Sequence, residues 1–166
     1  MQLRVASATH TYDGDGQRMG SSVFAPSPWS EAATNTAYTY GFDGLALRYL
    51  EAASEGASAT ITYLTHADGR AYAASYVATR GAETTGVVFE LMVNDHGDVV
   101  ALADATGEVF ARYGYGPFGE DEGVSVRATD ALPLALATEV ASANPLRYAG
   151  YCYDTWSGHY YLQARY

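Results

Sequence analysis

The fold is decided by residues 86–119, which read GVVFELMVNDHGDVVALADATGEVFARYGYGPFG. Apolar and mixed positions alternate along residues 87–93 and again along residues 109–115, and two turn sequences, 94–97 and 104–107, separate the apolar runs. Period-2 alternation of β-branched and aromatic residues between Asp, Asn and Gly turns predicts three antiparallel strands. Pro117 then ends the meander, because proline cannot donate a hydrogen bond to a central ladder.

The same strand–turn–strand pattern recurs towards the N-terminus. The turn aspartates are Asp13, Asp43, Asp68 and Asp95, roughly 25–30 residues apart. A single hairpin cannot bury its apolar face, so repeats of this period are typical of stacked architectures. We therefore predict an all-β protein, an antiparallel meander of stacked hairpins that forms a curved or spiralling sheet. Residues 25–35, 52–57 and 79–85 are predicted to be loops.

Residues 120–143 depart from this pattern. An acidic turn at 120–123 precedes an Ala- and Leu-rich stretch at 128–143. Asp130 could cap a helix that has Pro133 in its first turn, which predicts either a short inserted helix near 130–143 or an irregular surface loop. Residues 146–166 are predicted to close the chain with two strands around a turn at 156–158.

Composition restricts the classes of function. The 166 residues suit one domain, or a piece of a larger one. The net charge of −10 argues against nucleic-acid binding, and the absence of lysine excludes Schiff-base and P-loop chemistry. The 15 tyrosines suit half-buried strand faces. Neither a signal peptide nor an apolar run of membrane-spanning length is visible.

No motif for catalysis or metal binding stands out. The four histidines are far apart, and Cys152 is the single cysteine, so neither zinc spacing nor an internal disulfide is present. An EF-hand counted from Asp13 would need Gly and Glu where Arg18 and Phe24 stand. We expect a chain that is not an enzyme and holds no cofactor or metal. The alternative hypothesis is an enzyme in which two turn carboxylates converge in a cleft as general acid and base.

Two blocks, 95–120 and 144–166, resemble the C-terminal core of RHS (YD-repeat) proteins, and Tyr12-Asp13 followed by Arg18 resembles a single YD repeat. The resemblance implies one RHS core segment over 1–166, with degenerate YD-type hairpins at 1–85 and the core signature at 86–166, interrupted by the insertion at 120–143. The residues that carry it are Tyr12, Asp13, Asp68, Gly69, Arg70, Asp95, Gly97, Gly107, Tyr113, Tyr115, Pro117, Phe118, Gly119, Asn144, Pro145, Arg147, Tyr148, Gly150, Tyr153, Asp154, Gly158, Tyr160, Tyr161, Ala164, Arg165 and Tyr166.

The resemblance also implies a function. RHS shells are hollow β-cocoons that enclose a C-terminal toxin in bacterial competition or toxin complexes, and this chain would supply wall rather than toxin. Its partners would be neighbouring RHS repeats or a toxin domain of a larger protein, secreted or at the cell surface. RHS proteins often cut themselves just past the core within a segment that begins Arg-Tyr-Tyr-Asp-Pro. Here the match stops at Arg165-Tyr166, so no catalytic residue carries over.

Two further expectations concern surfaces. Open strand edges predict that this chain, when isolated, associates with other copies of itself. The alternative function is a Tyr-rich binding module for a carbohydrate or a cell-surface protein, which would require several tyrosine rings exposed together on one concave face.

Overall fold

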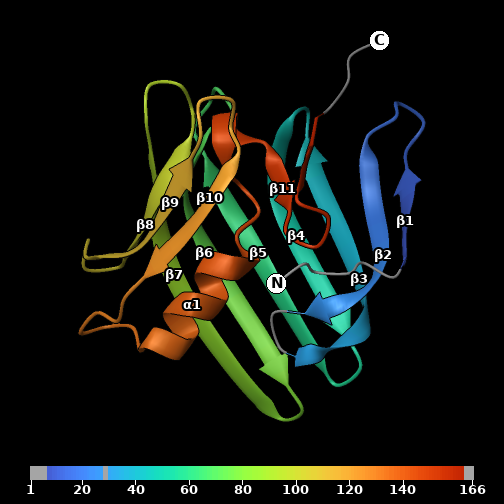
Figure 1. Cartoon of the computed structure of the whole chain (residues 1–166), viewed down its shortest axis with the longest axis horizontal. Helices are drawn as coiled ribbons and strands as arrows, with labels where there is room; N and C mark the ends of the chain where they lie inside the picture. The colour runs from blue at the N-terminus through green and yellow to red at the C-terminus, as the bar shows by residue number, and fades with distance from the viewer. Residues whose placement is uncertain (1–6, 28–29, 163–166) are drawn as a thin grey trace.

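Ten antiparallel strands form one twisted sheet whose spatial order follows the chain (Figure 1). The computed structural model describes residues 7–27 and 30–162, without the side chains of 26–32. The strands are β1 (Ser7–Tyr12), β2 (Arg18–Ser27), β3 (Ser30–Asp43), β4 (Ala46–Ser54), β5 (Ala57–Thr65), β6 (Ala71–Arg80), β7 (Glu83–Val93), β8 (Val99–Asp104), β9 (Val109–Tyr115) and β10 (Asp121–Val126). The predicted all-β meander, including the three strands of the opening segment, is confirmed.

The repeated turn has a common backbone geometry. In the turn after β5, the His66 N–H donates to the Arg70 carbonyl at 2.9 Å, and the Gly69 N–H donates to the His66 carbonyl at 3.0 Å. Gly69 has a φ of +85°, which is readily adopted only without a Cβ. Within the described residues, the turns that begin at Asp13, Asn94, Asp104 and Gly116 form the same pair of bonds. This is a three-residue hairpin loop closed by a bulge, and it explains why glycine recurs three positions after the first turn residue.

Several predicted loops are strands instead. β4 ends at Ser54 and β5 begins at Ala57, so the loop predicted at 52–57 is a two-residue turn with Gly56 at φ +73°. A second such turn replaces the loop at 79–85, between Arg80 and Glu83. Ladder pairing also continues through much of 25–35 and 120–123. Polar composition suggested loops, but Ser, Thr and Ala pair well on a solvent-facing strand.

One helix and a small hairpin follow the sheet. α1 (Leu134–Ala143) confirms the predicted helix, but its N-cap is Pro133 rather than Asp130, and no side chain caps its N-terminus. A 3₁₀ turn, η1 (Tyr148–Gly150), leads to β11 (Cys152–Asp154) and β12 (His159–Tyr161). These two strands form their own two-stranded sheet. Residues 152–161 are called the C-terminal hairpin below.

The core lies between one face of the sheet and these C-terminal elements. Figure 1 shows α1 and β11 in front of the same face of the sheet. Alternate residues of the central strands point into this layer; Ile61 pairs with Tyr76, and Tyr76 pairs with Val87. The fully buried members include Tyr63, Tyr76, Phe89, Leu102, Phe110 and Val140. The opposite face carries exposed residues such as Thr62 and Val88. Within 7–27 and 30–162, no helix is long and apolar enough to cross a membrane.

Candidate functional site

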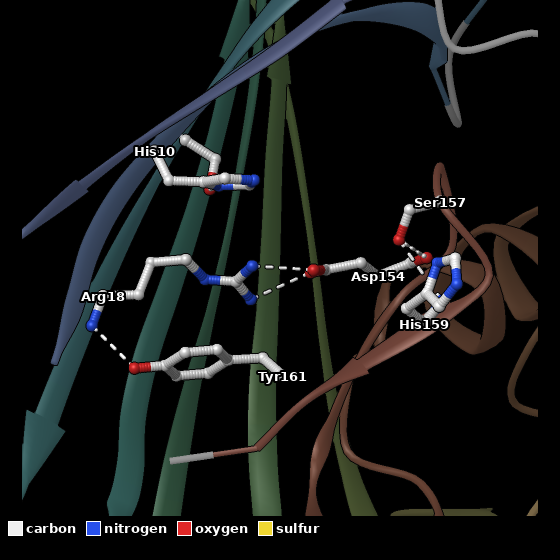
Figure 2. A network of polar contacts seen from close by, with 7 residues as sticks. His10, Arg18, Asp154, Ser157, His159 and Tyr161 are labelled. Carbon is white, nitrogen blue, oxygen red and sulfur yellow. Dashed lines mark hydrogen bonds and ion pairs between the residues drawn. The ribbon is translucent and has the colours of Figure 1, made fainter. Parts of the chain in front are cut away.

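A buried ion pair fastens the C-terminal hairpin to the start of β2. The Arg18 guanidinium donates two hydrogen bonds to the Asp154 carboxylate, at 2.7 and 2.9 Å (Figure 2). The two side chains are only 3% and 11% exposed. Bidentate geometry of this kind gives the strongest arginine–carboxylate contact and fixes the relative orientation of both groups. It joins residues that are 136 positions apart in the chain.

Two tyrosine rings enclose the Arg18 guanidinium. Its central carbon lies 4.5 Å from the ring centroid of Tyr40 and 4.3 Å from that of Tyr161. The Tyr161 hydroxyl also accepts a hydrogen bond from the Arg18 backbone N–H at 2.8 Å, so β12 is attached to the same residue. Burial alone would lower the pKa of Arg18, but the hydrogen bonds to Asp154 raise it above its ordinary value. Arg18 therefore stays charged.

Ser157 and His159 lie close to Asp154 but do not form a catalytic triad with it. The Ser157 hydroxyl contacts the Asp154 backbone carbonyl at 3.4 Å, and the His159 backbone N–H donates to that hydroxyl at 3.2 Å. A triad needs the carboxylate on the imidazole and the imidazole on the hydroxyl. Here the Asp154 carboxylate is bound by Arg18 instead (Figure 2).

A second buried network joins α1 to the sheet. The Arg147 guanidinium lies 3.8 Å from the ring centroid of Tyr113 and donates to the Ala141 carbonyl at 3.0 Å. The Tyr113 hydroxyl donates to the same carbonyl at 2.8 Å. The Tyr63 hydroxyl donates to Asn144 Oδ1 at 2.6 Å. The Ala141 carbonyl, in the last turn of α1, is therefore satisfied by side chains from β9 and from the segment after the helix.

Asp98 connects the β7–β8 turn to η1. Its carboxylate accepts hydrogen bonds from Asn94 Nδ2 at 2.7 Å and from the Ala149 N–H at 2.8 Å, and His96 Nδ1 lies 2.8 Å from it. Burial on its own raises the pKa of Asp98, but these hydrogen bonds outweigh burial and hold the pKa below its ordinary value. Ala149 has a φ of +51°, so the Asp98 contact stabilises a strained backbone conformation.

Asp104 organises the β8–β9 turn in the same way. Its carboxylate accepts hydrogen bonds from the Thr106 hydroxyl at 2.6 Å and from the backbone N–H of Glu108 at 3.1 Å, and Thr129 donates to its other oxygen. The threonine hydrogen bonds lower the pKa of Asp104 to about 2. The aspartates of these turns therefore act as hydrogen-bond acceptors that shape the backbone.

An open pocket of about 1050 Å³ lies at the turn end of the sheet. Its floor includes buried Leu47, Leu146 and Cys152, and its rim includes Arg48 and Arg70. Burial raises the pKa of the Cys152 thiol to about 12, so the thiol is protonated and unreactive in this conformation. Among the residues that the structure describes, no cluster of His, Cys, Asp and Glu could hold a metal ion.

The structure brings together many of the residues that carry the RHS resemblance. Tyr113, Asn144 and Arg147 share one network, and Asp154 and Tyr161 share the other. The rings of Tyr115, Tyr148, Tyr160 and Tyr153 form a chain of neighbours with centroids 5.0–6.4 Å apart. Gly97 and Gly150 lie against each other, and a Cβ at Gly119 would collide with the Tyr148 ring.

Other signature residues lie apart from these networks. Tyr12, Asp13, Asp68, Arg70, Asp95, Pro117 and Phe118 are exposed at turns or edges, and Gly69, Gly107 and Gly158 serve turn geometry. The Pro145 carbonyl accepts a hydrogen bond from the Tyr153 N–H at 2.8 Å. Ala164, Arg165 and Tyr166 lie outside the described residues. Arg18 could not be recognised as a site residue from the sequence, because a bulge between Arg18 and Gly20, opposite Thr11 and Tyr12, shifts the alternation of β2 and turns Arg18 inward.

The long antiparallel meander, followed by a helix and a hairpin, also occurs in known proteins. The crystal structure of TcdB2-TccC3 contains a similar region, with a TM-score of 0.65 and 20% identity over 93% of this chain and 7% of that chain. The tRNA3(Ser)-specific nuclease WapA of Bacillus spizizenii is 30% identical over 159 residues, and the tRNA nuclease WapA of Bacillus subtilis (strain 168) is 38% identical over 73 residues. No protein-family model matches the chain.

The likeness to the TcdB2-TccC3 region, at 20% identity, shows the fold of this chain. The match to the Bacillus spizizenii protein covers 96% of this chain but only 6% of that protein. The match to the Bacillus subtilis protein covers 3% of that protein. The expectation of a protein without enzymatic activity is overturned, because the curated relatives are named as nucleases. The named activity belongs to proteins that are many times longer than this chain.

Proposed function

We propose that the chain is one strip in the wall of an RHS-type shell that encloses a C-terminal toxin. The observation that carries this proposal is the ten-stranded sheet, in which strand order follows the chain and β1 and β10 each pair on one side only, within the described residues. Such a sheet can be extended by the strands of neighbouring repeats. The similarity to TcdB2-TccC3 and to WapA, each over a small share of a long protein, supports the same reading.

In this proposal the two buried networks hold the end of the wall together. Residues 1–85 would be degenerate YD-type hairpins, and residues 86–166 would be the RHS core, with α1 as its insertion. The Arg18–Asp154 pair would then join the first hairpin to the core signature. The partners would be neighbouring RHS repeats or the toxin domain of a larger secreted or cell-surface protein.

The first test is the size of the native product, detected in the source cells with an antibody against this segment. We expect a species much larger than the 17.7 kDa of this chain. Protease treatment of that species should leave a C-terminal domain intact until the shell is denatured. A product of 17.7 kDa alone, or a C-terminal domain cut as fast before denaturation as after it, would overturn the proposal.

The binding-module alternative has less support. It requires several tyrosine rings exposed together on one face, but Tyr40, Tyr63, Tyr76 and Tyr113 are buried in the core. The exposed tyrosines of the described residues lie on separate elements, in β1, β4, β6 and the segment before β11. Those elements hold Tyr12, Tyr49, Tyr72 and Tyr151.

A further inference from the structure

The C-terminal hairpin is built differently from the rest of the molecule. Its two strands have three residues each and are bonded to one another, not to the ten-stranded sheet. An isolated two-stranded hairpin is marginally stable in water, so this one depends on its attachments. Only Cys152 and Asp154 among residues 152–161 are buried.

Arg18 is the residue of the sheet that binds both strands of the hairpin. Arg18 binds Asp154 of β11 through its guanidinium and Tyr161 of β12 through its backbone N–H. The Trp156 ring against His10, the Tyr161 ring against Phe42 and a Tyr153–Asp121 hydrogen bond add further contacts. The backbone tie to the preceding segment is the bond from the Tyr153 N–H to the Pro145 carbonyl, together with a bridge between Leu146 and Cys152. Gly150, with a φ of +72°, precedes the hairpin and can absorb a change of direction.

The Arg18–Asp154 ion pair can break at a small cost in free energy when both groups become hydrated. A buried pair adds little net stability, because burial removes both charges from water and their attraction only offsets that cost. When the hairpin moves away, Arg18 and Asp154 both regain water. α1 contributes Ala137, Val140 and Ala141 to the buried core in addition to its polar network, whereas the hairpin contributes Cys152 as its one buried apolar residue among 152–161.

We propose that the C-terminal hairpin opens as a unit, with the Arg18–Asp154 pair as its fastening, while the ten-stranded sheet and α1 stay folded. Opening would uncover Tyr40 and expose the Cys152 thiol. This local opening is a property of the chain itself and does not depend on the wall function proposed above.

Cys152 provides the test, because it is the single cysteine, it lies on the hairpin and it is 5% exposed. A thiol reagent in excess reacts with it only after opening, so the labelling rate measures the population of the open state. The rate is measured on the full chain across a urea series and compared with global unfolding followed by far-UV circular dichroism. Fluorescence is avoided because Trp156 is on the hairpin.

For the unmodified chain we expect labelling through a local opening, with a urea dependence clearly shallower than that of global unfolding. Arg18→Gln should raise the labelling rate on the order of 100-fold, because Asp154 is then left unpaired in the closed state. The circular dichroism of the sheet should be unchanged. Arg112→Gln, the same change at an exposed position of β9, should leave the labelling rate as it is.

Equal urea dependence of labelling and of global unfolding would overturn the proposal, since the hairpin would then open only when the whole chain unfolds. This measurement needs no variant and decides the question even if Arg18→Gln fails to fold. An Arg18→Gln chain that folds and labels at the original rate would likewise overturn the role of the ion pair.

Discussion

Asp98 is a single residue whose charge supports a distant segment. It is 7% exposed, and its hydrogen bonds reach Asn94 within its own turn and Ala149, 51 positions later. Its pKa is lowered in the folded protein, so the folded state favours the ionised form. The stabilisation is therefore complete above the ordinary aspartate pKa of about 4 and is lost as the pH falls through the folded pKa.

Asp98→Asn should reduce the free energy of unfolding at pH 7 by about 1–2 kcal/mol, because hydrogen bonds to a charged acceptor are replaced by weaker ones. The original chain should lose stability as the pH falls below about 4, and the variant should lose less. Urea denaturation at several pH values between 3 and 7 measures both effects. Asp95→Asn, at an exposed neighbour, is the control. Identical acid sensitivity of Asp98→Asn and the original chain would show that Asp98 does not contribute.

Tyr63 shows the effect of one buried hydroxyl. It donates to Asn144 Oδ1 at 2.6 Å in a fully buried environment. Tyr63→Phe leaves that oxygen without its donor, and an unsatisfied buried acceptor costs about 1–3 kcal/mol. We expect the midpoint of urea denaturation to fall accordingly. Tyr49→Phe removes a hydroxyl from a ring that is 39% exposed and should change stability by less than about 0.5 kcal/mol. Equal effects of the two variants would contradict this account.

At the scale of elements, α1 depends on packing rather than on intrinsic signals. It has no side-chain cap at its N-terminus, no acidic residue in its first turn and no basic residue in its last. Val140 is fully buried against the sheet, whereas Leu134 of the same helix is 53% exposed. The apolar contacts of one face therefore hold the helix in place.

Val140→Ala should destabilise the chain by about 2 kcal/mol, through lost burial and the cavity left behind. Leu134→Ala removes a larger side chain from the same helix but should cost less than about 0.5 kcal/mol. Thermal and urea denaturation of the two variants test the difference. If Leu134→Ala were the more harmful change, the orientation of α1 described here would be wrong.

The strands could be predicted from the sequence more fully than the loops or the position of Arg18. Period-2 alternation and Asp-Gly turns predicted the meander and the strands of residues 86–119, because those signals are local. The loops predicted at 52–57 and 79–85 were wrong, since polar Ser, Thr and Glu occupy the solvent side of continuous strands. Arg18 could not be assigned to the site, because its partner Asp154 is 136 positions away and a bulge shifts the alternation of β2 directly after Arg18.

At the scale of the whole molecule, the two ends of the sheet differ. β10 carries Asp121 and Glu122 and a bulge between Asp121 and Gly123, features that discourage strand addition. β1 reads Ser-Ala-Thr-His-Thr-Tyr and carries no Asp, Glu, Lys, Arg or Pro. Its outer edge is therefore the more open to pairing with another strand.

We expect the isolated chain to self-associate through β1 as its concentration rises, because the backbone groups on that edge have no partner strand among the described residues. Thr9→Lys places a charge in the middle of β1 and should shift sedimentation-velocity profiles towards the monomer. Ser125→Lys makes the same kind of change on β10 and should leave association unaltered. A sharp monomer peak across the whole concentration series would contradict the prediction. A larger effect from Ser125→Lys would assign the pairing to the opposite edge, against the charge distribution of the two strands.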